Sequence, residues 1–214
     1  MCSIYLATIL VTLVYIGDSS AAPNVKLSLY YESLCPYSRA FILNQLVPTY
    51  QKLESILTVD LLVPYGWAKS TKVTKPDGTF DVEFTCQHGV QECIGNEIHN
   101  CVLNTETIAK TLTLFGCMYN ATDYKTPLTA GKECATKQGL NWAAIDECAT
   151  GPLGRGLHLL AGEVFNKATP KPTGVPHILL NGQHTAEISD RAEKDLVALV
   201  CDTYTGTKPD ACKK

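Results

Sequence analysis

The sequence lacks the features that would direct a protein into a membrane or onto a nucleic acid. After residue 16, no run of apolar residues is long enough to cross a bilayer. Basic residues form no block and the formal net charge is −3, so nucleic-acid binding has no electrostatic support. Internal repeats and low-complexity segments are also missing. We therefore expect a soluble protein with one sizeable core, no transmembrane segment and no nucleic-acid partner.

The first residues are typical of a secretory signal peptide. Residues 4–16 are apolar but too few to span a bilayer comfortably, and small residues follow them as a cleavage region. Cleavage is expected after Ala21, with an uncleaved anchor as the less favoured alternative. We therefore expect residues 1–21 to be a signal peptide and residues 22–214 to form a single secreted domain.

Cysteine parity singles out one thiol. The chain has ten cysteines, and Cys2 would leave with the signal peptide, so nine remain. In an oxidising compartment an odd number leaves one thiol without an internal partner, and we expect this thiol to be Cys35. The alternative is that another cysteine is free or pairs with a second molecule. The pairing of the other eight is open from the sequence; they are Cys86, Cys93, Cys101, Cys117, Cys134, Cys148, Cys201 and Cys212.

The first part of the mature chain reads as strand, helix and strand. Residues 25–31 alternate apolar and polar side chains, as a β-strand does. A helix is expected to begin near Pro36, because proline suits the first helical position, and Pro48 is expected to kink it. Residues 56–65 are apolar enough to form a strand that is buried on both faces.

The middle of the chain has a different character. Residues 84–156 hold six of the cysteines and several short helix-like pieces, which Gly and Pro separate. This composition predicts a helical insertion stapled by disulfides. The expected helices are residues 86–102, 105–118, 131–138 and 141–148.

The last part of the chain returns to alternating elements. Residues 157–165 read as a helix, and residues 174–182 as a strand that enters an Asn-Gly turn and then a short partner strand. A final helix is expected over residues 190–204, with Asp190 and Glu193 as a capping box. The order of elements indicates an α/β fold, namely a thioredoxin-like fold interrupted by a disulfide-rich helical insertion.

Residues 86–101 concentrate three cysteines and two histidines. Cysteine spacings of seven and eight are each close to two helical turns, so the three sulfurs are expected to form one stripe on a helix. Such a stripe is stapled by disulfides or holds a metal. Zinc–thiolate sites favour reducing compartments, so we favour disulfides and expect no metal. The zinc alternative would use Cys86, His88, Cys93, His99 and Cys101.

The histidines show no catalytic motif. We expect His88 and His99 to be a polar surface or packing pair, because nothing marks either as a general base. His158, His177 and His184 show no triad-like motif either, so a hydrolase has no support. A small secreted lipid-binding helical domain would explain the central cysteines, but it would leave the flanking strands unexplained.

Cys35 is placed where the first strand ends and the helix begins. A helix N-terminus offers free backbone N–H groups and a partial positive charge, which favour a thiolate over a thiol. A thiolate is the species that attacks disulfides. Ser38 stands where the second cysteine of a C-x-x-C dithiol would be, and its hydroxyl cannot release a mixed disulfide. We expect Ser38 to hydrogen-bond the Cys35 sulfur, or else to be a tolerated residue of the first helical turn.

The run from 86 to 101 fits CQHG-x2-EC-x2-N-x4-C at every fixed position. In this it resembles the signature of the gamma-interferon-inducible lysosomal thiol reductase (GILT) family. The resemblance implies a thioredoxin-like core, a secretory or endolysosomal route and disulfide reduction at acidic pH. It also implies a cis bond at Val175–Pro176 opposite Cys35, with the backbone near Val175 pairing with an extended substrate segment. The departure from the family pattern is Ser38 in place of the usual second cysteine.

Two functions follow from these features. In the first, Cys35 forms mixed disulfides with substrates, and reductase activity is weak or depends on an external small thiol; no cofactor is required. In the second, the protein is catalytically inactive and acts as a secreted binding or modulating partner of extracellular proteins or cell surfaces. Disulfide-bonded or extracellular proteins are the expected partners in both. Secretion is expected, with a lysosomal or endosomal destination as the alternative, and Asn120 lies in a glycosylation sequon.

Overall fold

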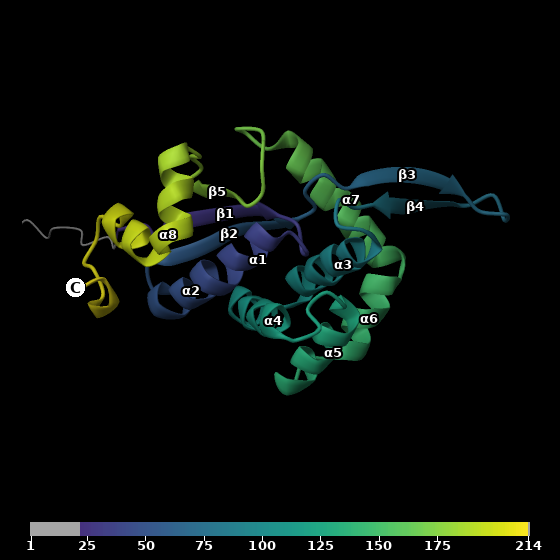
Figure 1. The fold of residues 1–214 in the computed structure, drawn as a ribbon, viewed down its shortest axis with the longest axis horizontal. Helices are drawn as coiled ribbons and strands as arrows, with labels where there is room; N and C mark the ends of the chain where they lie inside the picture. The colour runs from purple at the N-terminus through teal and green to yellow at the C-terminus, as the bar shows by residue number, and fades with distance from the viewer. Residues whose placement is uncertain (1–21, 214) are drawn as a thin grey trace, which may run out of the picture.

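A three-stranded sheet lies at the centre of the computed structural model, which describes residues 22–213 (Figure 1). The expected signal peptide lies outside the described residues. The strands are β1 (Val25–Tyr31), β2 (Leu57–Pro64) and β5 (His177–Leu180), in the order β2-β1-β5. β1 pairs parallel with β2 and antiparallel with β5, so β1 is central and its alternate side chains enter the core. The bounds of the predicted first and second strands are confirmed to within one residue at each end. The predicted burial of the second strand on both faces is wrong for its first half, where Thr58 and Asp60 are exposed.

One long helical segment follows β1. It consists of α1 (Pro36–Phe41), a π-helical turn η1 (Ile42–Leu46) and α2 (Val47–Leu53). Proline lacks the N–H that a regular helix needs, and the irregular turn directly precedes Pro48, the residue predicted to disturb the helix.

The final helix, α8 (Ala186–Thr203), packs on β5 and η1. It begins earlier than predicted, because the Thr185 hydroxyl accepts a hydrogen bond from the N–H of Ile188 and caps the helix. The predicted capping box at Asp190 and Glu193 is therefore wrong, since both residues lie inside the helix.

Five helices fill the middle of the chain and form a group beside the sheet (Figure 1). Two disulfides join them: Cys101–Cys148 connects α3 to α6, and Cys117–Cys134 connects α4 to α5. The predicted helical insertion is thus confirmed, although several helix ends differ. The helices are α3 (Val90–Thr105), α4 (Ile108–Asn120), α5 (Pro127–Lys137), α6 (Trp142–Thr150) and α7 (Pro152–Lys167).

The remaining disulfides staple shorter loops. Cys86–Cys93 closes the turn that leads into α3, and Cys201–Cys212 ties α8 to a short 3-10 turn, η2 (Asp210–Cys212). The eight predicted cysteines therefore form four bridges, as expected. None of the helices formed by residues 22–213 is long and apolar enough to cross a membrane.

A two-stranded hairpin projects from the body of the molecule (Figure 1). It is built from β3 (Lys69–Thr74) and β4 (Phe80–Thr85), which pair antiparallel, and the sequence analysis did not predict it. Most of its side chains are exposed, so it lacks the apolar face that marks a strand in a sequence. Asp81 anchors it to the body through two hydrogen bonds from Arg155, and Arg155 and Lys75 hold the pKa of Asp81 well below its usual range.

The turn after β5 also differs from the prediction. Asn181 and Gly182 both have positive φ, as an Asn-Gly turn requires. The expected partner strand is not formed, because Gln183 makes only an isolated bridge to Leu180 before the chain enters α8.

Candidate functional site

Cys35 stands at the junction of β1 and α1, as predicted. It is the N-cap residue of α1 with extended backbone, Pro36 takes the first helical position, and the Cys35 carbonyl accepts the N–H of Arg39. Among residues 22–213 it is the free cysteine, and only 5 % of it is exposed. The reduced sulfur therefore lies at the N-terminus of the helical segment.

The loop before β5 lies opposite this thiol. The Cys35 Sγ donates to the carbonyl oxygen of Val175 across 3.8 Å, and the Val175–Pro176 bond is cis, as predicted. Because β5 pairs directly with β1, residues 140 positions apart in the sequence meet here. Their proposed roles in catalysis and substrate binding stay predictions.

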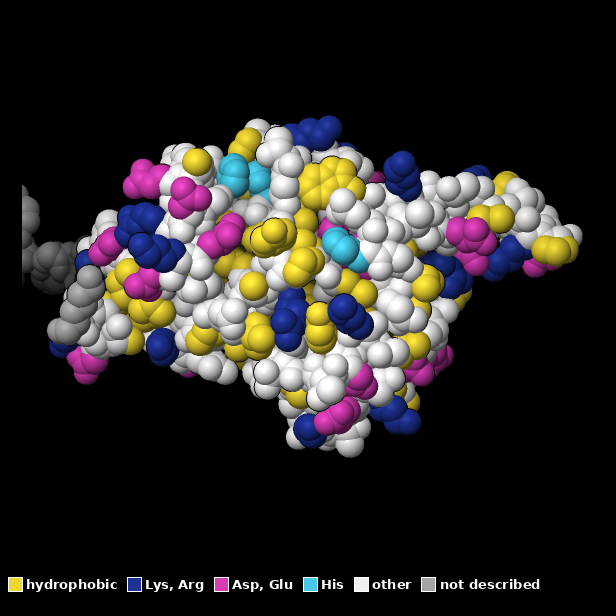
Figure 2. All heavy atoms as spheres, viewed as in Figure 1, with side chains coloured by type: hydrophobic (Ala, Val, Ile, Leu, Met, Phe, Trp, Pro, Cys, Tyr) yellow, Lys and Arg dark blue, Asp and Glu magenta, His cyan; other side chains and the backbone are white. Residues whose placement is uncertain are grey.

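A shallow groove runs along this loop. It is lined by Tyr37, residues 173–176, His177, His184 and Glu193. Tyr37, at the edge of the groove, is 72 % exposed. Figure 2 shows apolar side chains gathered between two groups of histidine side chains on the face that carries α1. An extended peptide segment is the kind of ligand that such a groove beside a strand can accept.

Ser38 does not make the hydrogen bond that was predicted for it. Its side chain is fully buried, and its hydroxyl oxygen has no hydrogen-bond partner. The Cys35 sulfur therefore receives no hydrogen bond from Ser38. The alternative interpretation, a tolerated residue in the first helical turn, agrees with this geometry.

For residues 86–101 the favoured disulfides are confirmed, but the predicted stripe on one helix is wrong. Cys86 lies in the turn before α3, which begins only at Val90, so the three sulfurs do not form a stripe on one helix. The zinc alternative fails as well, because Cys86 bonds Cys93 and Cys101 bonds a cysteine of α6. A sulfur in a disulfide is not a thiolate and cannot serve as that zinc ligand.

Polar residues of α3 hold the turn that precedes the thiol, here called the Cys35 turn (residues 32–35). The N–H of Ser33 donates to Oδ1 of Asn96 at 2.9 Å, and the Ser33 hydroxyl donates to the backbone oxygen of Glu92 at 3.0 Å. Asn100 donates to the backbone oxygen of Pro64 at the end of β2. This role was not predicted from the sequence. The available signal was the four-residue spacing of Glu92, Asn96 and Asn100, which places them on one face of a helix.

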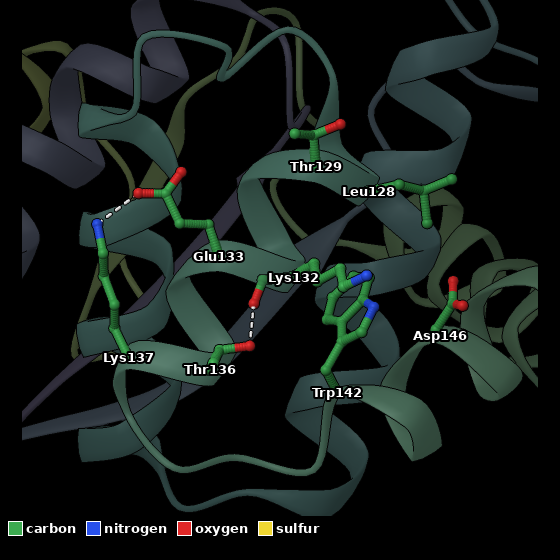
Figure 3. Close-up of a pocket in the computed structure, with 8 residues that line it drawn as sticks. All are labelled: Leu128, Thr129, Lys132, Glu133, Thr136, Lys137, Trp142 and Asp146. Carbon is green, nitrogen blue, oxygen red and sulfur yellow. Dashed lines mark hydrogen bonds and ion pairs between the residues drawn. The ribbon is translucent and has the colours of Figure 1, made fainter.

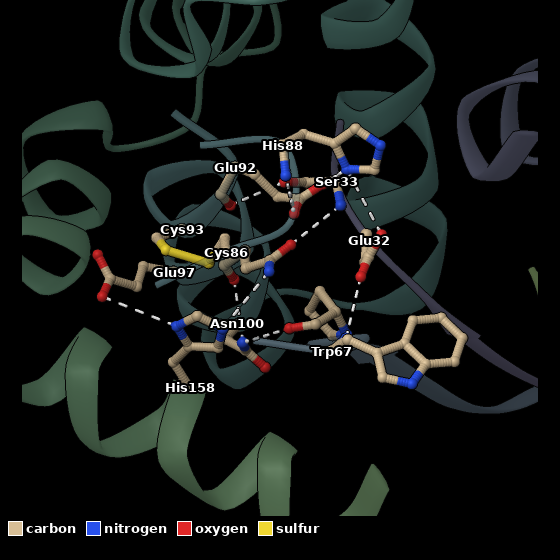
Figure 4. Close-up of a disulfide and its surroundings, with 12 residues drawn as sticks. Glu32, Ser33, Trp67, Cys86, His88, Glu92, Cys93, Glu97, Asn100 and His158 are labelled. Atoms are coloured by element: carbon tan, nitrogen blue, oxygen red, sulfur yellow. Dashed lines mark hydrogen bonds and ion pairs between the residues drawn. A yellow bond between two sulfur atoms is a disulfide. The ribbon is translucent and has the colours of Figure 1, made fainter. Parts of the chain in front are cut away.

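Three further side chains meet at the Cys35 turn, here called the Glu–His–Glu cluster (Glu32, His88 and Glu92; Figure 4). Nδ1 of His88 lies 2.5 Å from Oε2 of Glu92 and 3.5 Å from Oε2 of Glu32. Burial raises the pKa of Glu32, and the charge of Glu92 raises it further, while the N–H of Trp67 and the His88 ring act in the opposite direction. Gly66 has positive φ, and a Cβ there would lie 2.1 Å from Cγ of Glu32. Only glycine allows Glu32 this position.

His99 lies in the core and not on the surface with His88, so the predicted pair is not formed. Its ring stacks on Phe115 with centroids 3.8 Å apart, and Nδ1 is hydrogen-bonded to the Tyr31 hydroxyl at 3.0 Å. Burial lowers the pKa of His99 to about 3, so the ring is neutral near pH 7. Tyr119 is also buried beside this ring, and burial and the nearby Cys35 raise its pKa well above the usual value.

The other predicted residues are placed as follows. His158 stacks on Phe84 between the hairpin and α7, and His177 packs against His184 beside the groove. Asn120, the last residue of α4, is exposed, and its glycosylation stays a prediction.

A larger hollow than this groove lies elsewhere, on α5 and α6 (Figure 3). Trp142 lines it together with Leu128 and several charged side chains, of which Lys137 and Glu133 pair with each other. It contains no residue of the strand, turn or loop that carry Cys35 and Val175. We therefore do not place the chemistry there.

Comparison with known proteins finds relatives that match most of the chain. The family model described as "Gamma interferon inducible lysosomal thiol reductase (GILT)" matches residues 26–138. A protein of that name from Carassius auratus is 38 % identical over 193 residues, which cover 89 % of this chain and 73 % of the relative. GILT-like protein 1 of Drosophila melanogaster is 32 % identical over 212 residues, which cover 93 % of this chain and 82 % of the relative.

Comparison with solved structures identifies the fold. The oxidoreductase DsbA from Xylella fastidiosa matches with a TM-score of 0.50 at 14 % identity, covering 85 % of this chain and 90 % of that one. At this identity the match concerns the fold alone. The predicted fold class, a thioredoxin-like α/β fold with a helical insertion, is confirmed.

Proposed function

The chain belongs to the gamma interferon inducible lysosomal thiol reductase family, and from this premise we propose that it is a single-thiol oxidoreductase. In this proposal Cys35 attacks disulfides of protein substrates, and a small external thiol completes each turnover. The observation that carries it is the free Cys35 thiol, which caps a helical segment opposite Val175–Pro176, with Ser38 in the place of a second cysteine. We also propose the secretory or endolysosomal route that the family name suggests.

The first step is attack on the substrate. The Cys35 thiolate bonds to one sulfur of the substrate disulfide, and the other substrate sulfur leaves as a thiolate and takes up a proton. Backbone N–H groups at a helix N-terminus interact favourably with a negatively charged sulfur, both when the sulfur attacks and when it is the leaving group. The groove beside Val175 supports an extended segment next to the sulfur, and the 5 % exposure of Cys35 favours such a segment over a folded surface.

The second step needs a reductant, because Ser38 has no sulfur. A small thiol attacks the Cys35 sulfur of the mixed disulfide and releases the second substrate thiol. A second molecule of the small thiol then attacks the sulfur of the first one, which is now bonded to Cys35. The two small thiols leave as a disulfide, and the Cys35 thiol is restored. The sum is one substrate disulfide reduced to two thiols and two small thiols oxidised to one disulfide.

A second candidate function is a binding or modulating protein without catalysis. The observation that favours it is the exposure of Tyr37 and Trp67, which are 72 % and 41 % exposed. Tyr37 follows the Cys35 turn in the first turn of α1, and the backbone N–H of Trp67 donates a hydrogen bond to Glu32 of that turn. Aromatic side chains are enriched where proteins contact one another.

Covalent trapping separates the two functions. The mature protein is incubated with a disulfide-bonded peptide, acid-quenched and analysed by intact mass. The single-thiol function predicts an adduct of one half-peptide on wild type and no adduct on Cys35→Ser. Thr203→Ala, which removes a half-buried hydroxyl near the end of α8 and outside the groove, is the matched control and should form the adduct as wild type does. A wild type that forms no adduct would favour the binding function.

A further inference from the structure

Three potential metal ligands converge on one point in the Glu–His–Glu cluster (Figure 4). One ligand atom of each side chain lies within 4.8 Å of those of the other two. Glu32 follows β1, His88 lies in the turn closed by Cys86–Cys93, and Glu92 lies in the first turn of α3. We propose that Glu32, His88 and Glu92 bind one divalent transition-metal ion of the Zn²⁺ type. This inference does not depend on the reactivity of Cys35.

The carboxylates are oriented as metal ligands are. In each, Oε1 is held by a backbone N–H: that of Trp67 donates to Glu32 at 2.9 Å, and that of His88 donates to Glu92 at 3.0 Å. Both Oε2 atoms face Nδ1 of His88. Outer hydrogen bonds of this kind fix the direction of a ligand before the ion arrives.

The charges of the cluster call for a cation. Glu32 and Glu92 are 0 % and 1 % exposed, so two carboxyl groups are buried next to each other. Within residues 22–213, His88 is the one basic side chain with a nitrogen within 4.0 Å of either carboxyl group. A single imidazolium compensates at most one of the two negative charges, whereas a divalent ion compensates both.

The dimensions fit an ion with short bonds. Zinc binds nitrogen and oxygen at about 2.0–2.2 Å, so two ligands of a tetrahedral site lie about 3.4 Å apart. The Glu32–His88 separation of 3.5 Å already meets this value. The His88–Glu92 separation of 2.5 Å must widen, and the His88 side chain, which is 34 % exposed, has room to move outward. Its exposed side also leaves the fourth position to water. The nitrogen ligand favours zinc over calcium or magnesium.

The expected consequence is a firmer Cys35 turn. Glu32 precedes Cys35 by three residues, and an ion would tie it to the start of α3. The metal would therefore add to the two hydrogen bonds that already join Ser33 to α3.

Zinc affinity tests the proposal directly. The parent protein is the mature chain with Cys35→Ser, which removes the free thiol as a competing zinc ligand. It is dialysed with EDTA to remove bound metal. Its zinc affinity is then measured at pH 7 by competition with a chromophoric zinc chelator. We expect one zinc per chain and a rise in melting temperature with zinc. His88→Asn and Glu92→Gln should each weaken zinc binding at least tenfold. The matched controls are Glu97→Gln, on the same helix, and His184→Asn, and both should bind as the parent does.

Two results would overturn the proposal. One is the absence of zinc binding, which would leave the His88 ring between the carboxyl groups, with the Gln87 amide donating to Glu32 at 3.1 Å, as the full account of the cluster. The other is zinc binding that His184→Asn weakens and His88→Asn does not. Melting curves in EDTA establish that each variant is folded. The His88 side chain is partly exposed, so we expect His88→Asn to fold. This variant therefore decides the test even if Glu92→Gln fails to fold.

Discussion

His99 should make the folded protein less stable as the pH falls below 6.5. Burial lowers the pKa of His99 from 6.5 to about 3, so the folded protein keeps the ring neutral where the unfolded chain takes up a proton. Between these two values the unfolded state binds more protons, and stability is lost as the pH falls. Each pH unit in this window is worth about 1.4 kcal/mol, so the loss between pH 7.5 and pH 5 is about 2 kcal/mol.

The test compares urea unfolding of wild type and His99→Phe at both pH values, with the disulfides intact. Other titrating groups change both proteins alike, so the free-energy difference between the two should shift by about 2 kcal/mol in favour of His99→Phe at pH 5. Tyr31→Phe is the matched control: it removes the same hydrogen bond but keeps the titrating ring, so it should retain the pH dependence of wild type. An equal difference between wild type and His99→Phe at both pH values would refute the reasoning.

Three further substitutions test the structure around Cys35. Gly66→Ala should destabilise the fold and reduce adduct formation, because a Cβ at this positive-φ position would overlap Glu32; an unchanged melting temperature would contradict this. Ser38→Ala should leave stability unchanged or slightly raised in urea unfolding, since the buried hydroxyl has no partner to lose, and a loss above about 1 kcal/mol would show that it has one. Replacing Cys101 and Cys148 together by alanine should cost about 4 kcal/mol in urea unfolding, from the loop that their disulfide closes, and a cost below about 1 kcal/mol would be inconsistent with that model.

The parts of the fold that were predicted correctly follow from local rules. Residues 25–31 alternate apolar and polar side chains because one set enters the core, and β1 has these bounds. Pro36 marks the start of a helix because its missing N–H costs nothing at that position, and this places Cys35 at the cap. Parity indicated one free thiol because disulfides consume cysteines in pairs, and the place of Cys35 at the start of a helix favoured it as that thiol.

The parts that were missed depend on contacts between distant residues. The side chains of the β3–β4 hairpin are mostly exposed, so its sequence has no hydrophobic pattern that predicts strands. The contact of Asp81 with Arg155, which anchors the hairpin, forms only in the folded chain. Cys86 leaves the predicted helix because Gly89, at positive φ, starts α3 one turn later. The Ser33–Asn96 hydrogen bond joins residues 63 positions apart. Spacing shows which residues share a helix face, but not what that face meets.

Disulfide reduction by the purified mature protein near pH 5 tests the central claim most directly. Wild type, Cys35→Ser and Ser38→Cys are each assayed with and without a small thiol. A single-thiol site predicts turnover in wild type that requires the added thiol, none in Cys35→Ser, and in Ser38→Cys faster release of the mixed disulfide. Wild-type protein that gives no turnover with the thiol present, while Ser38→Cys is active, would contradict it and would identify an intact scaffold without catalysis.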